Sequence, residues 1–197
     1  MEGDITLRYS KKGEKFIGLD DIEYTLDDGM ILICDEKKII SLAGVMGGKN
    51  SGCDSNTKNV VLESAYFSPE NIAKTGRKLN IQSDARYRFE RGIDPRSIEL
   101  GLSKAAELIS EICGGKISNF DIQKTEKYEK NKIKFNISLF EKITGFKVDD
   151  NEIVKILTDL GFEVSKKKLE LDLKIPSIVE YVMCPVPKKP KFINYAE

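Results

Sequence analysis

A charged segment, residues 124–132 (KTEKYEKNK), divides the apolar pattern of this chain into two parts. Regular patterns of apolar residues precede this segment and begin again after it, whereas the segment itself has the polar composition of a linker. We therefore predict two folded units, at residues 1–123 and 133–177, joined by the linker. We expect the Pro/Lys-rich tail at residues 178–197 (containing PVPKKPKF) to be an extended, poorly packed end or unrelated sequence that follows a truncation or frameshift.

Residues 4–67 have the pattern of strands and turns. Ile5, Leu7 and Tyr9 alternate with polar residues, which is typical of a strand. The turn signal Asp27-Asp28-Gly29 separates two apolar runs at 22–26 and 30–34. Further apolar runs at 39–42 and 60–67 complete a region that we expect to be mostly β.

Two helices are expected to follow. Ser68 is a suitable N-cap and Pro69 suits the first helical position. The second helix begins after Asp94-Pro95, carries an apolar stripe from Ile98 to Ile112, and ends at Gly114-Gly115. The spacing of that stripe predicts that it faces the core.

Beyond the linker the sequence predicts two short helices and a hairpin. Ser138 and Glu141 match a capping box for a helix that ends at Gly145. Asp149 or Asp150 caps the next helix, which Gly161 ends, and residues 162–164 and 169–175 form a hairpin across an SKKK turn. This order predicts a small winged-helix-like unit, so the expected fold class is α+β.

Composition excludes several classes of function. The chain has 32 Lys+Arg, 32 Asp+Glu and no histidine, so no overall field draws it to nucleic acid and no Ser/His or Cys/His nucleophile is present. Four scattered cysteines without a CxxC pair argue against a zinc site and predict no metal. We expect reduced thiols, no membrane segment and a cytoplasmic protein.

A glycine-rich stretch, residues 43–51 (AGVMGGKNS), is close to a phosphate-binding P-loop. Asn50 stands where a P-loop needs a hydroxyl residue, and more loop follows where its helix should begin. Only Gly48-Lys49 favours a nucleotide enzyme. Two interpretations remain: a tight turn without a ligand, or a turn whose glycines let backbone amides approach a ligand.

A second charged stretch, residues 82–95 (QSDARYRFERGIDP), places Ala85, Tyr87 and Phe89 on one side of an extended chain. Asp84, Arg86, Arg88 and Glu90 then lie on the other side. This alternation predicts an amphipathic strand. The strand has either a solvated outer face or one side that forms the wall of a substrate pocket.

Four motifs carry a resemblance to a known family: LAGVMGGKNSG (42–52), NVVLESAYFSPENI (59–72), SDARYRFERGIDP (83–95) and the helix that ends at CGG (113–115). Together they resemble the β chain of bacterial phenylalanyl-tRNA synthetase, in its editing module, which hydrolyses tyrosine misattached to the tRNA for phenylalanine. Residues 133–177 resemble the winged-helix-like domain that follows it. The resemblance covers residues 1–177 and implies tRNA binding in translation.

The resemblance assigns roles to particular residues. Glu63 matches the glutamate that receives the tyrosine hydroxyl, and Ser83 stands where many relatives have threonine. Ala85 matches a small residue that leaves room for the ring. Gly44, Gly47 and Gly48 match the loop that lines the pocket, where amides hold a carbonyl or position water. Arg86, Arg88 and Arg91 would brace the pocket or face tRNA. The alternatives are that Glu63 pairs with Arg86 or Arg88, and that Ser83 and Ala85 are ordinary strand residues.

The sequence also departs from the family. Its β chains continue upstream, with a histidine near the pocket, and downstream, with acidic residues that bind magnesium. Here IVEYVMCPVPKKPKFINYAE follows Ser177. We therefore expect a fragment without the synthetase core, with no cofactor of its own. The full-length enzyme uses ATP and magnesium and an α chain partner. With no certain catalytic residue, hydrolysis would rest on positioned water; the alternative is a non-catalytic RNA- or partner-binding remnant.

Overall fold

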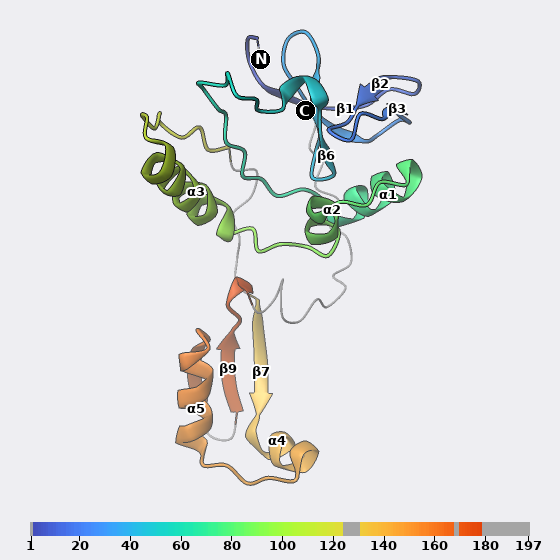
Figure 1. The fold of residues 1–197 in the computed structure, drawn as a ribbon. Helices are drawn as coiled ribbons and strands as arrows, with labels where there is room; N and C mark the ends of the chain where they lie inside the picture. Colours follow the sequence, from blue (N-terminus) through green and yellow to red (C-terminus); the bar gives the residue numbers. More distant parts are fainter. Residues whose placement is uncertain (1, 124–130, 168–169, 179–197) are drawn as a thin grey trace. The chain divides into compact units, whose positions relative to one another are not determined.

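The computed structural model describes residues 2–123, 131–167 and 170–178 (Figure 1). Most of the predicted linker, the end of the SKKK turn and the tail from 179 onward lie outside the described residues. The chain divides into two compact units. Among the described residues, one unit holds those up to Ile93 with Ser97–Gly115, and the other holds Asp94–Arg96 with those from Lys116 onward. Helices and antiparallel sheets occur in the chain, which confirms the α+β class; the exact domain limits stay a prediction.

The first unit contains two antiparallel sheets. The larger has the strand order β1-β4-β5-β6 and the smaller pairs β2 with β3. A short 3-10 helix, η1 (Lys49–Ser51), follows the last of these strands. The strand bounds are β1 Thr6–Tyr9, β2 Lys15–Ile17, β3 Glu23–Thr25, β4 Ile31–Cys34, β5 Ile39–Leu42 and β6 Met46–Gly47.

The core of this unit is centred on β4 and β5. Leu32 faces Leu42 across the two strands, and both side chains are 0% exposed. A bridge between Gly18 and Gly48 joins the smaller sheet to the end of β6, and the amide of Leu19 donates to the carbonyl of Gly47 at 3.0 Å. These contacts hold the β6 side of the turn between β5 and β6 against the smaller sheet.

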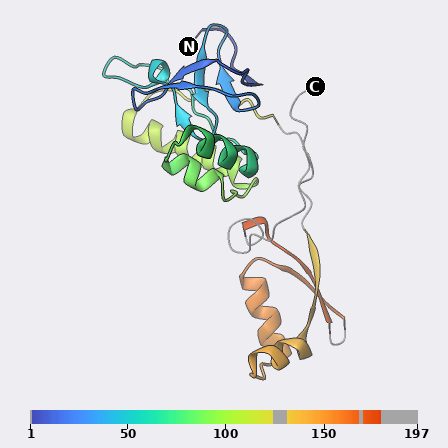
Figure 2. The same cartoon turned by 90° about the vertical axis from the view of Figure 1, so that its right-hand side faces the viewer.

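Helices α1 (Pro69–Leu79), α2 (Asp84–Phe89) and α3 (Ser97–Cys113) lie on one side of the strands, as Figure 2 shows. The predicted start of α1 is confirmed: the Ser68 hydroxyl accepts a hydrogen bond from the amide of Asn71, and Pro69 is the first residue. Asn80 ends this helix in the left-handed conformation, with φ of 52°. Asparagine tolerates that region better than most residues.

Two predicted strands are wrong. Residues 84–89 form helix α2, because Ser83 caps it by accepting a hydrogen bond from the amide of Arg86 at 3.1 Å. An alternation of only three apolar residues did not distinguish a strand from a helix. The cap favours the helix because it satisfies the Arg86 amide, which a strand would have to pair with a neighbouring strand. The apolar run at 60–67 has no strand and passes as irregular chain between η1 and α1.

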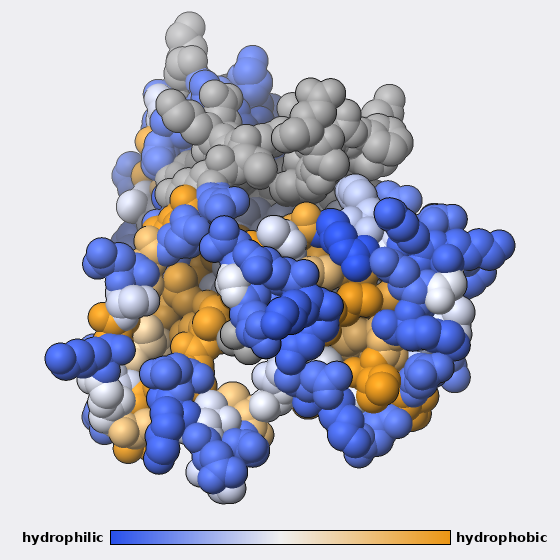
Figure 3. All heavy atoms as spheres, turned by 90° about the horizontal axis from the view of Figure 1, so that it is seen from above, coloured by the Kyte–Doolittle hydropathy of each residue, from blue (hydrophilic) through white to orange (hydrophobic). Residues whose placement is uncertain are grey.

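The stripe on α3 is less buried than its spacing predicts. Ile98, Leu102, Ala105 and Ile109 are half-buried, and Ile112 is 79% exposed. The prediction that this stripe is core is therefore only partly correct. Figure 3 shows, for one face of the chain as a whole, hydrophobic residues exposed between hydrophilic ones.

The second unit combines a three-stranded antiparallel sheet with two helices. Its elements are β7 (Lys132–Asn136), α4 (Ile137–Thr144), α5 (Asp150–Asp159), β8 (Glu163–Lys167) and β9 (Glu170–Lys174), and the sheet order is β7-β9-β8. The sequence did not predict β7, which begins at the last residue of the expected linker. The two helices and an antiparallel β8–β9 pair are present as expected, but the predicted turn is wrong in part, because Ser165, Lys166 and Lys167 pair with β9 as part of β8. A winged-helix relationship stays a prediction.

The helix caps of this unit follow local chemistry. Asp149 caps α5 as predicted, and Gly145 ends α4 with φ of 75°. The capping box at Ser138 is wrong, because the side chain of Asn136 accepts the bonds from the amides of Ser138 and Leu139. Ile153 of α5 packs with Leu171 and Leu173 of β9 as the buried core.

Replacement of Leu42 tests where the first core lies. We expect Leu42→Ala to lower the free energy of unfolding of this unit by about 2–5 kcal/mol, because a fully buried leucine leaves a cavity. Leu100→Ala on α3, where the side chain is 74% exposed, should change it by less than about 0.5 kcal/mol. Urea unfolding followed at residues of β4 measures both; equal losses would contradict this core.

Candidate functional site

The first unit contains an open cavity of about 480 Å³. This volume lies within the usual range of small-molecule sites. Three segments far apart in the sequence form most of its wall: the chain around the β5–β6 turn, the irregular segment before α1, and helix α2 with the residues next to it. Leu19 joins them from the chain after β2. The residues that line it are Leu19, Ser41, Gly44, Val45, Met46, Gly47, Glu63, Ser64, Ala65, Ser83, Ala85, Phe89 and Ile93.

The glycine turn, residues 43–48, forms one wall. The amide of Val45 donates to the carbonyl of Leu42 at 2.9 Å, and Gly44 has φ of +65°, which favours glycine. A Cβ at Gly44 would lie 3.0 Å from both Ile72 and Phe67. Conformation and packing therefore both require glycine at position 44.

The three glycines predicted to line the pocket differ in what they do. Gly44 and Gly47 line the cavity, and within the described chain the Gly44 amide donates no hydrogen bond, so it can serve a ligand. Gly48 lies outside the lining: its amide donates to the carbonyl of Ile40 at 2.8 Å, and a Cβ there would lie 2.4 Å from that oxygen. Gly48 therefore allows the close approach of two backbone segments.

Glu63 is the acidic residue of the cavity. The residue is exposed, and nearby protein atoms reduce the hydration of its carboxyl. This desolvation raises the pKa of the Glu63 carboxyl above its ordinary value. Within the described residues the carboxylate has no ion pair and no hydrogen bond, so it is a free acceptor facing the cavity.

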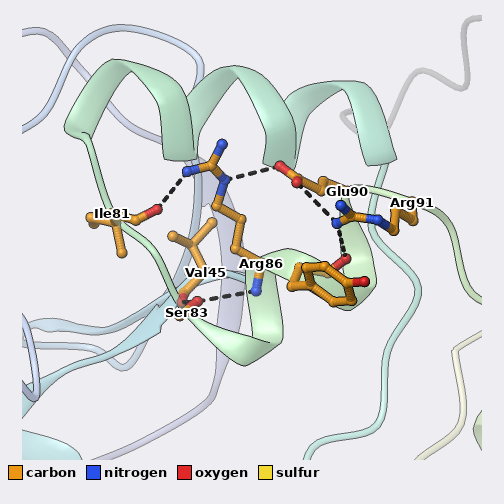
Figure 4. Close-up of polar contacts among 7 residues, drawn as sticks. Val45, Ile81, Ser83, Arg86, Glu90 and Arg91 are labelled. Carbon is orange, nitrogen blue, oxygen red and sulfur yellow. Dashed lines mark hydrogen bonds and ion pairs between the residues drawn. The ribbon is translucent and has the colours of Figure 1, made fainter.

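The Ser83 hydroxyl joins α2 to the glycine turn. It donates to the carbonyl of Val45 at 2.5 Å and accepts from the amide of Arg86 at 3.1 Å, as Figure 4 shows. A hydroxyl has one donor and two acceptor positions. One acceptor position therefore remains, so Ser83 can receive a bond from a ligand donor but cannot donate one without breaking a contact of the fold.

Helix α2 presents three different faces. Ala85 and Phe89 face the cavity. Arg86 lies against α1, and its guanidinium donates to Glu90 at 2.9 Å and to the carbonyl of Ile81 at 2.6 Å (Figure 4). Tyr87 is exposed.

The other two arginines lie on the exposed side. Arg88 is paired only loosely with Asp84, at 3.8 Å, and its side chain is 66% exposed. The Arg91 guanidinium lies over the Tyr87 ring at 3.6 Å from its centroid. The alternative in which Glu63 pairs with Arg86 or Arg88 is wrong, because both arginines have these other partners.

Several lining residues were absent from the sequence-based prediction. Ser64 and Ala65 directly follow Glu63, and their position next to it was the available signal. The Phe89 ring packs against that of Phe67 with ring centroids 5.4 Å apart and a tilt of 48°, and both rings lie next to Gly44. Leu19 is brought to the cavity by the Gly18–Gly48 bridge and by its own hydrogen bond to Gly47, which no local pattern indicated.

The structure gives no support to a phosphate loop. After Gly48 the chain forms only the short helix η1, and the Lys49 ammonium pairs with Asp21. In the described part of the chain, no group of three or more acidic or cysteine side chains could hold a metal ion. No helix among the described residues has the length and apolar character to cross a membrane.

Comparisons with known proteins agree on one family. The model of the B3/4 domain matches residues 1–114. This chain is also similar to three curated relatives, the phenylalanine–tRNA ligase beta subunits of Brucella suis, Bradyrhizobium diazoefficiens and Nitrobacter winogradskyi. They are 40%, 41% and 42% identical to this chain over 177 residues, which is 90% of its length. The match covers 22% of each relative, so the chain spans about a fifth of their length. The resemblance inferred from the four motifs is confirmed.

The raised pKa of Glu63 has a consequence for stability. Because the folded state holds this proton more tightly than the unfolded state, the ionised carboxylate destabilises the fold, and stability falls as the pH rises above the ordinary value of 4.5. We expect Glu63→Gln to raise the unfolding midpoint at pH 7 relative to the unmodified chain and to lose this advantage below pH 4.5.

The measurement is unfolding by urea across this pH range, with Glu111→Gln, an exposed position on α3, as the comparison for removal of a surface charge. Carbon-13 NMR titration of the Glu63 carboxyl gives the pKa directly. A pKa at or below that of an unfolded glutamate would contradict the geometry described for the cavity.

Proposed function

Because this chain belongs to the B3/4 domain family, we propose that its cavity is an editing site. The site takes the side chain of tyrosine misattached to the tRNA for phenylalanine, so that the ester to the tRNA can be hydrolysed. The activity is that of a phenylalanine–tRNA ligase β chain. Support comes from the relatives that are 40–42% identical to 90% of this chain and from the chemistry of the cavity.

The observation that carries the proposal is one unpaired carboxylate in a largely apolar recess. The Glu63 carboxylate accepts the hydrogen bond of a phenol, while Ala65, Ala85 and Phe89 leave apolar walls for the ring. Phenylalanine fits the same walls but leaves this desolvated carboxylate without a donor. A site built for a hydroxyl rejects the analogue that lacks it much more strongly than an apolar site rejects a change of size.

The raised pKa of Glu63 is consistent with this role. A carboxylate that has lost part of its hydration has more to gain from a phenol donor than one in bulk water. The selection of tyrosine over phenylalanine therefore depends on the same desolvation that makes the protein less stable when no ligand is bound. Such a conflict between stability and local chemistry is typical of functional sites.

Hydrolysis in this site would rest on positioning. The sequence has no histidine, so we assign no general base among its residues. The Gly44 amide can hold a carbonyl oxygen or a water molecule, and the remaining acceptor position of Ser83 can receive a donor from the ammonium group of the amino acid. The ribose hydroxyl next to the ester is the nearest further group on the substrate.

We propose tRNA for phenylalanine as the macromolecular partner and the synthetase α chain as the protein partner, in the cytoplasm where translation takes place. The side chains of Arg88 and Arg91 are exposed, so their guanidinium groups are available to contact tRNA phosphates. ATP and magnesium serve ligation in the full-length family enzyme, and we assign neither a site among the described residues.

The first test of the function replaces Glu63. In a β chain that carries this sequence, Glu63→Ala should reduce hydrolysis of Tyr-tRNA much more than any residual hydrolysis of Phe-tRNA. Loss of a hydrogen bond to a charged group costs about 1.5–3 kcal/mol, so discrimination should fall roughly 10- to 150-fold.

Deacylation of the two charged tRNAs measures this ratio, and Glu111→Ala on α3 provides the control. Equal losses for both substrates would show that Glu63 does not read the hydroxyl. Absence of any hydrolysis by the unmodified protein would favour a non-catalytic RNA-binding role instead.

The second test fills the cavity. Ala85 is exposed and faces the cavity, so Ala85→Trp should block tyrosine by volume and reduce Tyr-tRNA hydrolysis at least 10-fold, while the melting temperature changes little. Tyr87→Trp, on the solvent face of the same helix, is the matched control. A collapse of stability by the roughly 1–3 kcal/mol of core overpacking would instead identify Ala85 as a packing residue.

A further inference from the structure

We propose that Arg86 is a positioning residue, which fixes helix α2 against Gly76 of α1 and thereby sets the pocket wall at Ser83 and Ala85. The identity of the ligand rests on the proposed function. The arrangement of Arg86 does not, because it follows from contacts within the first unit.

Arg86 is a buried cation among exposed neighbours. Its side chain is 9% exposed, compared with 66% for Arg88 on the same helix. The guanidinium donates through Nε to Glu90 at 2.9 Å and through Nη1 to the carbonyl of Ile81 at 2.6 Å. Figure 4 shows these two bonds on opposite sides of the group. A buried charge needs such partners, so these bonds hold one orientation.

Gly76 provides the space for this group. A Cβ at position 76 would lie 2.3 Å from both Cδ and Nε of Arg86 and 2.8 Å from Cζ. Position 76 is in the interior of α1, where glycine is less favourable than alanine. Its presence in a helix is therefore explained by the arginine that crosses it.

The position of Arg86 reaches the cavity through its own backbone. Its amide donates to the Ser83 hydroxyl, and that hydroxyl donates to the carbonyl of Val45 in the glycine turn. Helix α2 has only six residues, too few to be stable without tertiary contacts. A helix this short takes the position its anchors give it, so displacement of the guanidinium moves Ser83 and Ala85 together.

The shape of the anchor is specific to arginine. A guanidinium donates in two fixed directions from a planar group, whereas the lysine ammonium is a single point on a flexible chain. Arg86→Lys therefore keeps the charge but cannot hold both Glu90 and the Ile81 carbonyl in the present geometry.

A double-mutant cycle on this chain tests the contact with Gly76. Gly76→Ala should lower the melting temperature of the first unit by roughly 5 °C or more, because the added methyl group displaces Arg86. In a protein that also carries Arg86→Ala, Gly76→Ala should be neutral or stabilising. No arginine side chain is then displaced, and only the higher helix propensity of alanine remains. Gly101→Ala in α3, where the nearest side-chain atom is 3.9 Å away, should be harmless in both backgrounds.

A second measurement separates positioning from stability. In nitrogen-15 NMR spectra taken well below the unfolding temperature, Arg86→Met and Arg86→Lys should both shift the amide signals of Gly44, Val45 and Ala85. Arg88→Met removes a charge from the exposed face of the same helix and should leave the signals of Gly44 and Val45 in place.

Deacylation of Tyr-tRNA by a β chain carrying these variants completes the test. We expect Arg86→Lys to lose discrimination between Tyr- and Phe-tRNA although it is folded. Inactivity of the unmodified protein would overturn the editing function, but the spectra and the cycle would still decide the role of Arg86. Additive effects in the cycle, or unchanged glycine-turn signals in folded Arg86 variants, would overturn the present proposal.

Discussion

One hydroxyl group holds the two principal walls of the cavity together. Ser83 begins helix α2 by accepting from the amide of Arg86, and it bonds at 2.5 Å to the carbonyl of Val45 in the glycine turn. The cap satisfies a donor that would otherwise be unpaired at the helix start. The same oxygen therefore starts helix α2 and sets the distance between that helix and the glycine turn. Threonine carries an equivalent hydroxyl and differs from serine by one methyl group.

The cavity combines this rigid frame with an unsatisfied charge. The sequence left Arg86 or Arg88 as a possible partner of Glu63, yet these arginines interact with Glu90 and Asp84. The Arg91 guanidinium lies over the Tyr87 ring. Among the residues that the structure describes, the Glu63 carboxylate has no cationic partner, and its pKa is raised by desolvation. In a folded protein such a group usually acquires a partner, and we propose that here the partner is the ligand.

The features predicted correctly from the sequence depend on neighbours along the chain. Ser68 followed by Pro69, and Asp149 before α5, are caps that need only a few residues to act. Helix α2 was missed because three alternating apolar residues fit either period, although its cap, Ser83, lies only three positions from the Arg86 amide that donates to it. The contact from Ser83 to Val45, which no local pattern indicates, spans 38 positions. The burial of α3 was overestimated for a related reason: spacing identifies an apolar face but not what packs on it.

The candidate site shows the same division. Gly44, Gly47, Glu63, Ser83 and Ala85 were selected through the resemblance, and the structure places all five around one cavity. No pattern in the sequence could bring them together, because three separate segments contribute. Gly48 could not be distinguished from Gly47 without the backbone of Ile40, which lies too close for any side chain. The residues' chemical roles remain a proposal that depends on the ligand.

The central claim is that these three segments form one pocket that selects a phenol. Titration of the nitrogen-15-labelled chain with L-tyrosine and with L-phenylalanine, followed by NMR, tests it most directly. The account predicts that tyrosine shifts the amide signals of Gly44, Ala65 and Ala85 at lower concentration than phenylalanine does, and that Glu63→Gln reduces this difference. Equal responses to the two amino acids, or responses confined to residues outside the cavity, would contradict it.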